Sequence, residues 1–270
     1  MNDILTSLDE HILTIELNRV EKRNALTLEM YLEIARLLSG AQDNPDVRVV
    51  LLRSVGDNFS AGNDLKDFLD HPPGSGDSPQ KRLIDALRAL DKPLVAAVRG
   101  AAVGSGATML TYCDFVYAGD TARFQYPFIN LALVPEFGTS FSLVDQVGYL
   151  RAAEIVLLGH PFSAQEALAM GLVTSVVADG DVFETALKTA RELVQKPADA
   201  LAACKKLMRS HTSARLDQAI AMELQEFSAK VRSDDAREAI AAFFEKRPPR
   251  FNLGGAAETL PTSASSRISS

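Results

Sequence analysis

Runs of apolar residues divide the chain into short predicted strands. Two runs rich in Ile, Leu and Thr, "ILTSLD" (4–9) and "ILTIELN" (12–18), are separated by Glu10-His11 and predict a hairpin. Continuous apolar runs at 47–55, 93–100 and 114–119 are typical of strands covered on both faces, and "LVTSVV" (172–177) predicts one more.

Helices are predicted between these strands from apolar spacing and capping residues. Thr27 is a suitable N-cap for a helix that runs to about Gly40. Ser163 and Glu166 form a capping box at the start of a helix that stops at Gly171. Because strand, glycine-rich turn and helix recur in this order, we predict an α/β core with a mainly parallel sheet.

The C-terminal third of the chain is predicted to be helical. Helices fill roughly 182–245, with breaks near Pro197 and Ser233. A further helix follows the loop predicted at 71–80 and runs to about Leu90.

Two glycine-rich turns directly follow predicted strands and are the first candidates for chemistry. They are "FSAGNDLKDF" (59–68) and "VRGAAVGSGATML" (98–110), and a helix begins after each. Small residues let the backbone approach a ligand, and a helix start leaves N–H donors unpaired. One such turn most often reflects tight packing. Two of them on successive strands can converge on one oxygen and stabilise an oxyanion.

Glu136 is the one ionisable residue in "LALVPEFGTSFSL" (131–143). A carboxylate among apolar residues loses hydration, and neighbours such as Val134 and Phe137 should raise its pKa. Two interpretations are open at this point. Glu136 is a favourable charge before a helix that starts near Thr139, or it is a base held in a pocket.

Composition and charge indicate which classes of binding partner and which cellular location to expect. With 270 residues and 47% hydrophobic content, the chain can bury a core of one domain plus an appendage. A net charge of −7 argues against nucleic acid but permits a small anionic ligand beside local Lys and Arg. Two cysteines and four histidines at no metal-ligand spacing predict no metal and a reducing, cytoplasmic location. We see no signal peptide and no run near the ~20 apolar residues of a membrane span, so no membrane is expected.

Four ordered motifs resemble the enoyl-CoA hydratase/isomerase (crotonase) superfamily over roughly residues 3–250. They are "NRVEKRNALT", "FSAGNDL", "VRGAAVGSGATMLTYCDFVYA" and "SAQEALAMGLV". The resemblance implies an α/β, crotonase-type spiral of repeated β-β-α units over 1–195, with the CoA and oxyanion sites. It also implies a C-terminal helical trimerisation region over 196–251 and a homotrimer or dimer of trimers. The tail, 252–270, is low in bulky apolar groups and is expected to be disordered.

The resemblance also implies an acyl-CoA thioester substrate, with no separate cofactor and no metal. The backbone N–H groups of Asn63 and Ser105 would form the oxyanion hole. Other positions carried over to the substrate and CoA site are Lys22, Arg23, Ala25, Ala61, Asp64, Leu65, Gly104 and Gly106. In the C-terminal segment, Phe244 and Lys246 would reach the CoA of a neighbouring subunit.

The acid–base residues distinguish between reactions of the family. Its hydratases use two glutamates, and Thr108 and Phe128 occupy those positions here, so hydration is disfavoured. Glu136 resembles the lone catalytic glutamate of delta-3, delta-2-enoyl-CoA isomerases. We therefore predict conversion of 3-enoyl-CoA to trans-2-enoyl-CoA by 1,3-proton transfer. Hydratase-like, hydrolase or dehalogenase activity at this site remains an alternative, as does a non-catalytic acyl-CoA-binding or scaffold protein.

Overall fold

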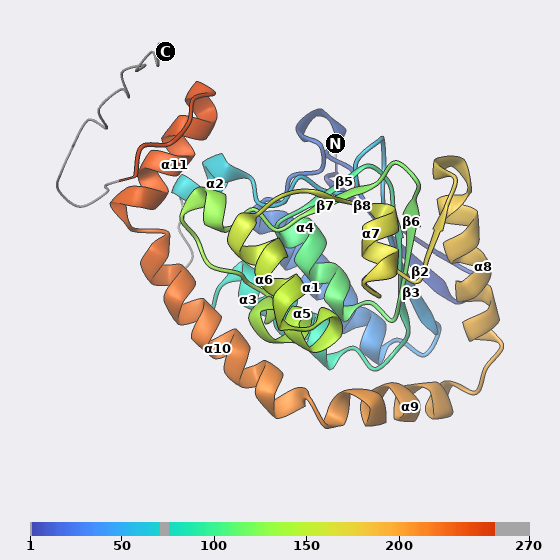
Figure 1. Cartoon of the computed structure of the whole chain (residues 1–270). Coiled ribbons are helices and arrows are strands. Elements are labelled where there is room, and N and C mark those ends of the chain that lie inside the picture. The colour runs from blue at the N-terminus through green and yellow to red at the C-terminus, as the bar shows by residue number, and fades with distance from the viewer. Residues whose placement is uncertain (1, 71–75, 252–270) are drawn as a thin grey trace, which may run out of the picture.

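A six-stranded sheet forms the centre of the computed structural model, which describes residues 2–70 and 76–251 (Figure 1). Its strands, in spatial order, are β1 (Ile4–Asp9), β2 (Ile12–Leu17), β3 (Val49–Ser54), β4 (Leu94–Val98), β6 (Phe115–Gly119) and β9 (Ser175–Val177). β1 and β2 pair antiparallel, and every later neighbour pairs parallel. The predicted hairpin and the mainly parallel sheet are confirmed.

A second, three-stranded sheet was not expected from the sequence. It contains β5 (Ala101–Val103), β7 (Arg123–Gln125) and β8 (Phe162–Ser163). Strands of two or three residues are too short to give a readable alternation. The chain passes from β4 to β5 through Gly100, which has φ 57° and whose added Cβ would lie 1.9 Å from the carbonyl oxygen of Asp57. Only glycine fits this change of direction.

The first helices follow the hairpin and the two glycine-rich turns along the chain. They are α1 (Leu28–Asp43), α2 (Leu65–Asp70), α3 (Pro79–Ala89) and α4 (Ser105–Thr108). The hydroxyl of Thr27 accepts the N–H of Met30, as its N-cap role predicts. α1 continues three residues past Gly40, because that glycine keeps a helical conformation inside it. Within the loop predicted at 71–80, residues 71–75 lie outside the described residues, and α3 begins at Pro79.

The middle helices come after β7 in the chain. They are α5 (Thr139–Val147) and α6 (Tyr149–Leu158), which precede β8, and α7 (Ala164–Ala169), which follows it. Short 3-10 turns occur at η1 (Val20–Lys22), η2 (Met109–Tyr112), η3 (Ile129–Leu131) and η4 (Asp179–Asp181). The capping box of Ser163 and Glu166 is present at the start of α7, as predicted. The helix predicted after the second glycine-rich turn is only the four residues of α4, continued by η2.

The C-terminal helices are α8 (Val182–Val194), α9 (Ala198–Ser210), α10 (Ser213–Lys230) and α11 (Asp234–Glu245). α8 covers one face of the large sheet, where Val182 and Ala186 pack against strand residues such as Val95. Figure 1 shows α9 and α10 running along the outside of the body as an arm that ends at α11. The predicted breaks near Pro197 and Ser233 are confirmed, and a further break separates α9 from α10.

The structure bears on the predicted absence of a membrane span but does not describe the predicted disordered tail. The tail predicted to be disordered, 252–270, lies outside the described residues. Within residues 2–70 and 76–251, no helix is both long enough and apolar enough to cross a membrane.

Candidate active site

The two glycine-rich turns lie side by side and are hydrogen-bonded to each other. The N–H of Ser60 donates to the carbonyl of Ala101 at 3.0 Å, and the N–H of Val103 donates to the carbonyl of Ser60 at 2.9 Å. Gly62, with φ 87°, approaches so closely that an added Cβ would lie 2.8 Å from the carbonyl oxygen of Val103 and 3.7 Å from Cα of Gly104. The absence of side chains at both glycines brings the residues that follow them together.

Asn63 and Ser105, the residues that follow those glycines, each present a free backbone N–H. No hydrogen bond among residues 2–70 and 76–251 uses either group. Ser105 is the first residue of α4, where an N–H has no partner within the helix. An added Cβ on Gly106 would lie 2.6 Å from Cβ of Ser60, so the start of α4 packs directly against the first turn. These two unpaired N–H groups are therefore the candidate donors of an oxyanion hole.

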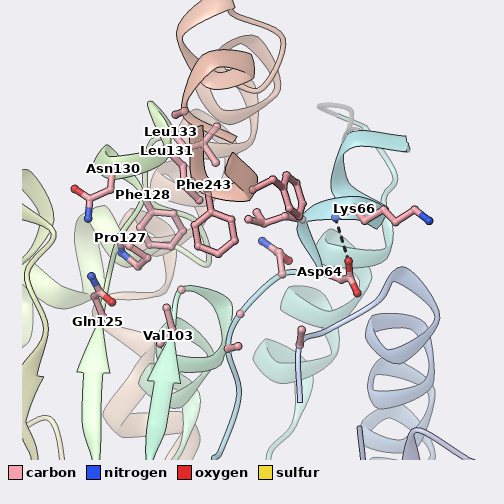
Figure 2. A pocket seen from close by; sticks show the side chains of 18 of the residues that line it. Asp64, Lys66, Val103, Gln125, Pro127, Phe128, Asn130, Leu131, Leu133 and Phe243 are labelled. Carbon is pink, nitrogen blue, oxygen red and sulfur yellow. Dashed lines mark hydrogen bonds between the residues drawn. The ribbon is translucent and has the colours of Figure 1, made fainter. Parts of the chain in front are cut away.

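A cavity of about 820 Å³ opens in front of these turns (Figure 2). Seven of the predicted site residues line it: Lys22, Ala25, Ala61, Asn63, Asp64, Leu65 and Gly104. Of the other described residues predicted to bind substrate or to form the oxyanion hole, Arg23, Ser105 and Gly106 are not part of the lining of this cavity. The Arg23 side chain is exposed, and its carbonyl accepts the N–H of Ala61 at 2.9 Å. Phe244 lines the cavity of its own chain, and Lys246 does not line it.

The cavity has a cationic part and an apolar part. Its cations are Arg19, Lys22, Lys66 and Arg247, and the acid among its described lining residues is Asp64, which Arg19 pairs at 2.7 Å. The apolar part includes Leu131, Leu133, Phe128, Phe227, Phe243 and Phe244. Figure 2 shows the rings of Phe128 and Phe243 projecting into the cavity. A ligand with phosphates at one end and an apolar arm suits this lining.

Glu136 lies behind the large cavity and faces a much smaller one. The smaller cavity, of about 20 Å³, is lined by Gln80, Ile84, Glu136, Phe137, Ile220, Glu223, Leu224 and Phe227. Phe227 lines both cavities, and Asn63 lines the large one while its side-chain Nδ2 lies 3.5 Å from Oε1 of Glu136. Phe227 and Asn63 therefore connect the surroundings of the buried acid with the large cavity.

The environment of Glu136 favours its protonated form. The pKa of Glu136 is raised to about 8, mainly by burial and also by the nearby Glu223 carboxylate, while the Asn63 hydrogen bond acts in the opposite direction. The raised pKa of Glu136 agrees with the increase expected from its apolar neighbours in the sequence. The contribution of Glu223 was not indicated by the sequence.

Glu136 is not the acid that stabilises the start of α5. The N–H groups of Gly138 and Ser140 both donate to the carboxylate of Glu223 from α10, each at 2.6 Å. Glu223 therefore satisfies the helix start, where a negative charge is favourable. The helix-terminal interpretation of Glu136 is wrong in this respect, and its carboxylate is left for another role.

The two hydratase positions hold no acid. The Thr108 side chain is fully buried in α4, and its hydroxyl lies 3.5 Å from the carbonyl oxygen of Ser105. Phe128 is buried and contributes its ring to the large cavity. Neither side chain transfers protons near neutral pH.

Sequence reasoning missed several residues that build the site. The phenol of Tyr31 donates to Oδ1 of Asn63 at 2.6 Å, although at the sequence level Tyr31 is one apolar position among several in α1. Glu223 lies at helical spacing between Ile220 and Phe227, and all three are buried. The sequence could have indicated Glu223, because it is an acid on the apolar face of an amphipathic helix. Among the described residues, no group of three His, Cys, Asp or Glu is arranged to hold a metal.

Comparison with known proteins places this geometry in a family. The profile of the enoyl-CoA hydratase/isomerase family matches residues 7–253. The chain is 34% identical to 1,2-epoxyphenylacetyl-CoA isomerase of Escherichia coli over 93% of its length and 98% of that protein. It is 32% identical to 2,3-dehydroadipyl-CoA hydratase of the same organism, over 93% of its length and 99% of that protein.

A solved structure supports the same assignment. The crystal structure of an enoyl-CoA hydratase/isomerase from Pseudoalteromonas atlantica superposes with a TM-score of 0.88 at 37% identity, covering 93% of this chain and all of that one. The chain belongs to the enoyl-CoA hydratase/isomerase family and has the crotonase fold.

Proposed function

We propose that this protein is an enoyl-CoA isomerase that converts 3-enoyl-CoA to trans-2-enoyl-CoA, with Glu136 as its single acid–base group. One observation carries the proposal. Glu136 is buried beside the oxyanion turns, while Thr108 and Phe128 stand where the hydratases of the family have acids. The family membership supports an acyl-CoA substrate, and this site chemistry supports the isomerisation.

The backbone donors would act on the thioester carbonyl. As the proton leaves C2, negative charge develops on the carbonyl oxygen, and the N–H groups of Asn63 and Ser105 would stabilise it. Losing one such donor typically costs ~3 kcal/mol of transition-state stabilisation. The cations Arg19, Lys22 and Lys66 at the large cavity would hold the phosphates of CoA.

The proton transfer needs no water and no second acid. Glu136 breaks the C2–H bond and takes the proton, and the electron pair delocalises as a dienolate onto the thioester oxygen. Glu136 then gives the proton to C4, and the double bond moves from C3–C4 to C2–C3. A carboxyl group with a raised pKa suits both steps, because it is a stronger base and still a usable acid.

An aromatic acyl group is a second candidate for the same site. The aromatic side chains Phe128, Phe227, Phe243 and Phe244 line the large cavity. Aromatic rings pack favourably against one another in offset or edge-to-face arrangements. An aryl-acyl-CoA isomerisation would use the same base and the same oxyanion donors.

Product analysis of Glu136→Gln tests the proposal. The purified wild type is incubated with aliphatic and aryl-substituted 3-enoyl-CoAs, trans-2-enoyl-CoAs and a haloaryl-acyl-CoA, and products are identified by mass spectrometry and ultraviolet absorbance. We expect the wild type to shift the double bond and Glu136→Gln to lose at least about 100-fold in kcat, since proton transfer by a positioned base contributes 10²–10⁴-fold. Glu192→Gln, an exposed acid on α8, is the matched control.

Each other product contradicts isomerisation in a defined way. A hydroxyacyl-CoA identifies a hydratase, a free acid a hydrolase, and released halide from a haloaryl ester a dehalogenase. Tight ester binding without turnover identifies a binding protein.

The homotrimer or dimer of trimers implied by the resemblance is part of this proposal, and sedimentation of the purified chain tests it.

A further inference from the structure

Glu223 is a buried acid to which the mechanism above gives no role. It lies on α10, in the C-terminal arm, and its side chain is 6% exposed. Its Oε2 accepts the N–H of Gly138 at 2.6 Å, and its Oε1 accepts the N–H of Ser140 at 2.6 Å. Both oxygens of this carboxyl are therefore fixed by the backbone that follows Glu136.

The backbone that Glu223 holds is a strained turn. Phe137 and Gly138 have φ of 63° and 71°, in the left-handed region that non-glycine residues rarely adopt. The hydroxyl of Tyr112 donates to the carbonyl of Phe137 at 2.7 Å. An added Cβ on Gly138 would lie 2.4 Å from Cδ1 of Leu216, so α10 packs directly on this turn. The position of Glu136 therefore depends on α10.

Glu136 and Glu223 also face one small cavity. It measures about 20 Å³, which is enough for roughly one water molecule. Gln80 lines it as well, is 5% exposed, and has a buried Oε1 with no hydrogen-bond partner among the described residues. The cavity thus brings two carboxyl groups and one unsatisfied amide oxygen together, away from bulk solvent.

We propose that Glu223 is a positioning residue for Glu136, which clamps the turn that carries the base and forms with it one proton-binding pair across the small cavity. This rests on the proposed role of Glu136 as the base. The pair holds one proton more readily than two separate acids would, because two negative charges in a buried space repel each other.

The titratable groups that face Glu136 and Glu223 do not change charge in the pH range in which these two acids titrate. Tyr31 faces it from α1 and Tyr112 from η2, and burial raises the pKa of both phenols, so both stay neutral while the acids titrate. Burial also raises the pKa of Glu223 to about 7, while hydrogen bonds from Ser140, Gly138 and Thr139 oppose it. Ionisation of either acid therefore opposes ionisation of the other.

The pH profile of Glu223→Gln tests the pair through activity. We expect the ascending limb of kcat/KM for the 3-enoyl-CoA to move down by about one pH unit, the interaction at which two acids titrate as a pair. We expect kcat at the plateau to fall and KM to change little. Glu226→Gln, an exposed acid one turn along α10, should leave the profile in place. A lower kcat with an unmoved midpoint would show a structural role alone and overturn the proposal.

Proton release on unfolding tests the pair without any activity. The wild type, Glu136→Gln and Glu223→Gln are unfolded in guanidinium at a series of pH values from 6 to 9 in weakly buffered indicator solution. Proton release should persist to about one pH unit higher in the wild type than in Glu223→Gln, because the Glu223 charge keeps the proton on Glu136 in the folded protein. The same pH dependence of release in the wild type and Glu223→Gln would overturn the pair. Retained isomerisation by Glu136→Gln would instead overturn the proposed function, so the two failures are distinguishable.

Discussion

Tyr31 donates its phenolic hydrogen to the side-chain oxygen of Asn63 at 2.6 Å, which directs the Asn63 amide nitrogen toward Glu136 at 3.5 Å. Asn63 thereby serves both halves of the site. Its backbone N–H is a candidate oxyanion donor, and its side chain is a hydrogen-bond donor for the base. Tyr31 is fully buried in α1, so this orientation is held from the protein core.

Tyr31→Phe should lower kcat about fivefold, with little change in KM. The variant keeps the ring but frees the Asn63 amide to rotate, and a buried hydrogen bond contributes about 1 kcal/mol. Steady-state kinetics with a 3-enoyl-CoA measures this. Tyr149→Phe removes an exposed hydroxyl and is the control. An unchanged kcat in Tyr31→Phe would mean that the Asn63 amide needs no external support.

The activity should rise with pH. Because burial raises the pKa of Glu136 to about 8, little of the base form exists in the free enzyme at pH 6. kcat/KM reports the free enzyme, so it should increase through pH 7 and level off above about pH 8. Initial rates from pH 5.5 to 9.5 in constant ionic strength measure the profile. A flat profile over that range would contradict a base with this environment.

Folding stability should change with pH in the opposite sense. The folded pKa of Glu136 is raised from 4.5 to about 8, so its contribution is fully present below pH 4.5 and is lost as pH rises through 8. Glu136→Gln cannot ionise. The Tm of this variant relative to wild type should therefore increase between pH 5 and pH 9, as measured by circular dichroism. A constant difference would show that Glu136 has equal proton affinity in both states.

Gly62→Ala should inactivate the enzyme. Its Cβ would lie 2.8 Å from the carbonyl of Val103, at a φ of 87°, and would push the two turns apart. Losing an aligned oxyanion donor lowers kcat by about 100-fold or more. Gly40→Ala places the same methyl group in open space within α1 and should raise the unfolding free energy by about 0.5–1 kcal/mol without changing kcat. Similar losses in both variants would refute the assignment of the turns.

Lys22→Ala should raise KM for the acyl-CoA about fivefold, corresponding to about 1 kcal/mol, with kcat nearly constant. The effect should shrink in high salt, because exposed charges are screened. Arg23→Ala is the matched comparison, since the Arg23 side chain is exposed and does not line the cavity. Equal increases in KM for the two variants would show that Arg23 also reaches the phosphates, as the resemblance implies.

Local signals in the sequence predicted much of the fold and part of the site. The hairpin, the apolar strand segments, the Thr27 cap and the Ser163 capping box depend on residues within a few positions of each other. Glu136 was identifiable for the same reason, because one acid among apolar neighbours is visible in a short window. Resemblance to the family added the meaning of the two glycine-rich turns.

The sequence by itself determined which residues form strands, caps and glycine turns, because backbone geometry and apolar periodicity act over short distances. Tertiary packing alone decided that Tyr31 meets Asn63, 32 residues away, and that Glu223 meets Gly138, 85 residues away. Those contacts depend on how whole helices pack on one another, which no local pattern specifies. The pKa of Glu136 follows from that packing, since burial and the Glu223 charge arise only when α10 folds over the turn.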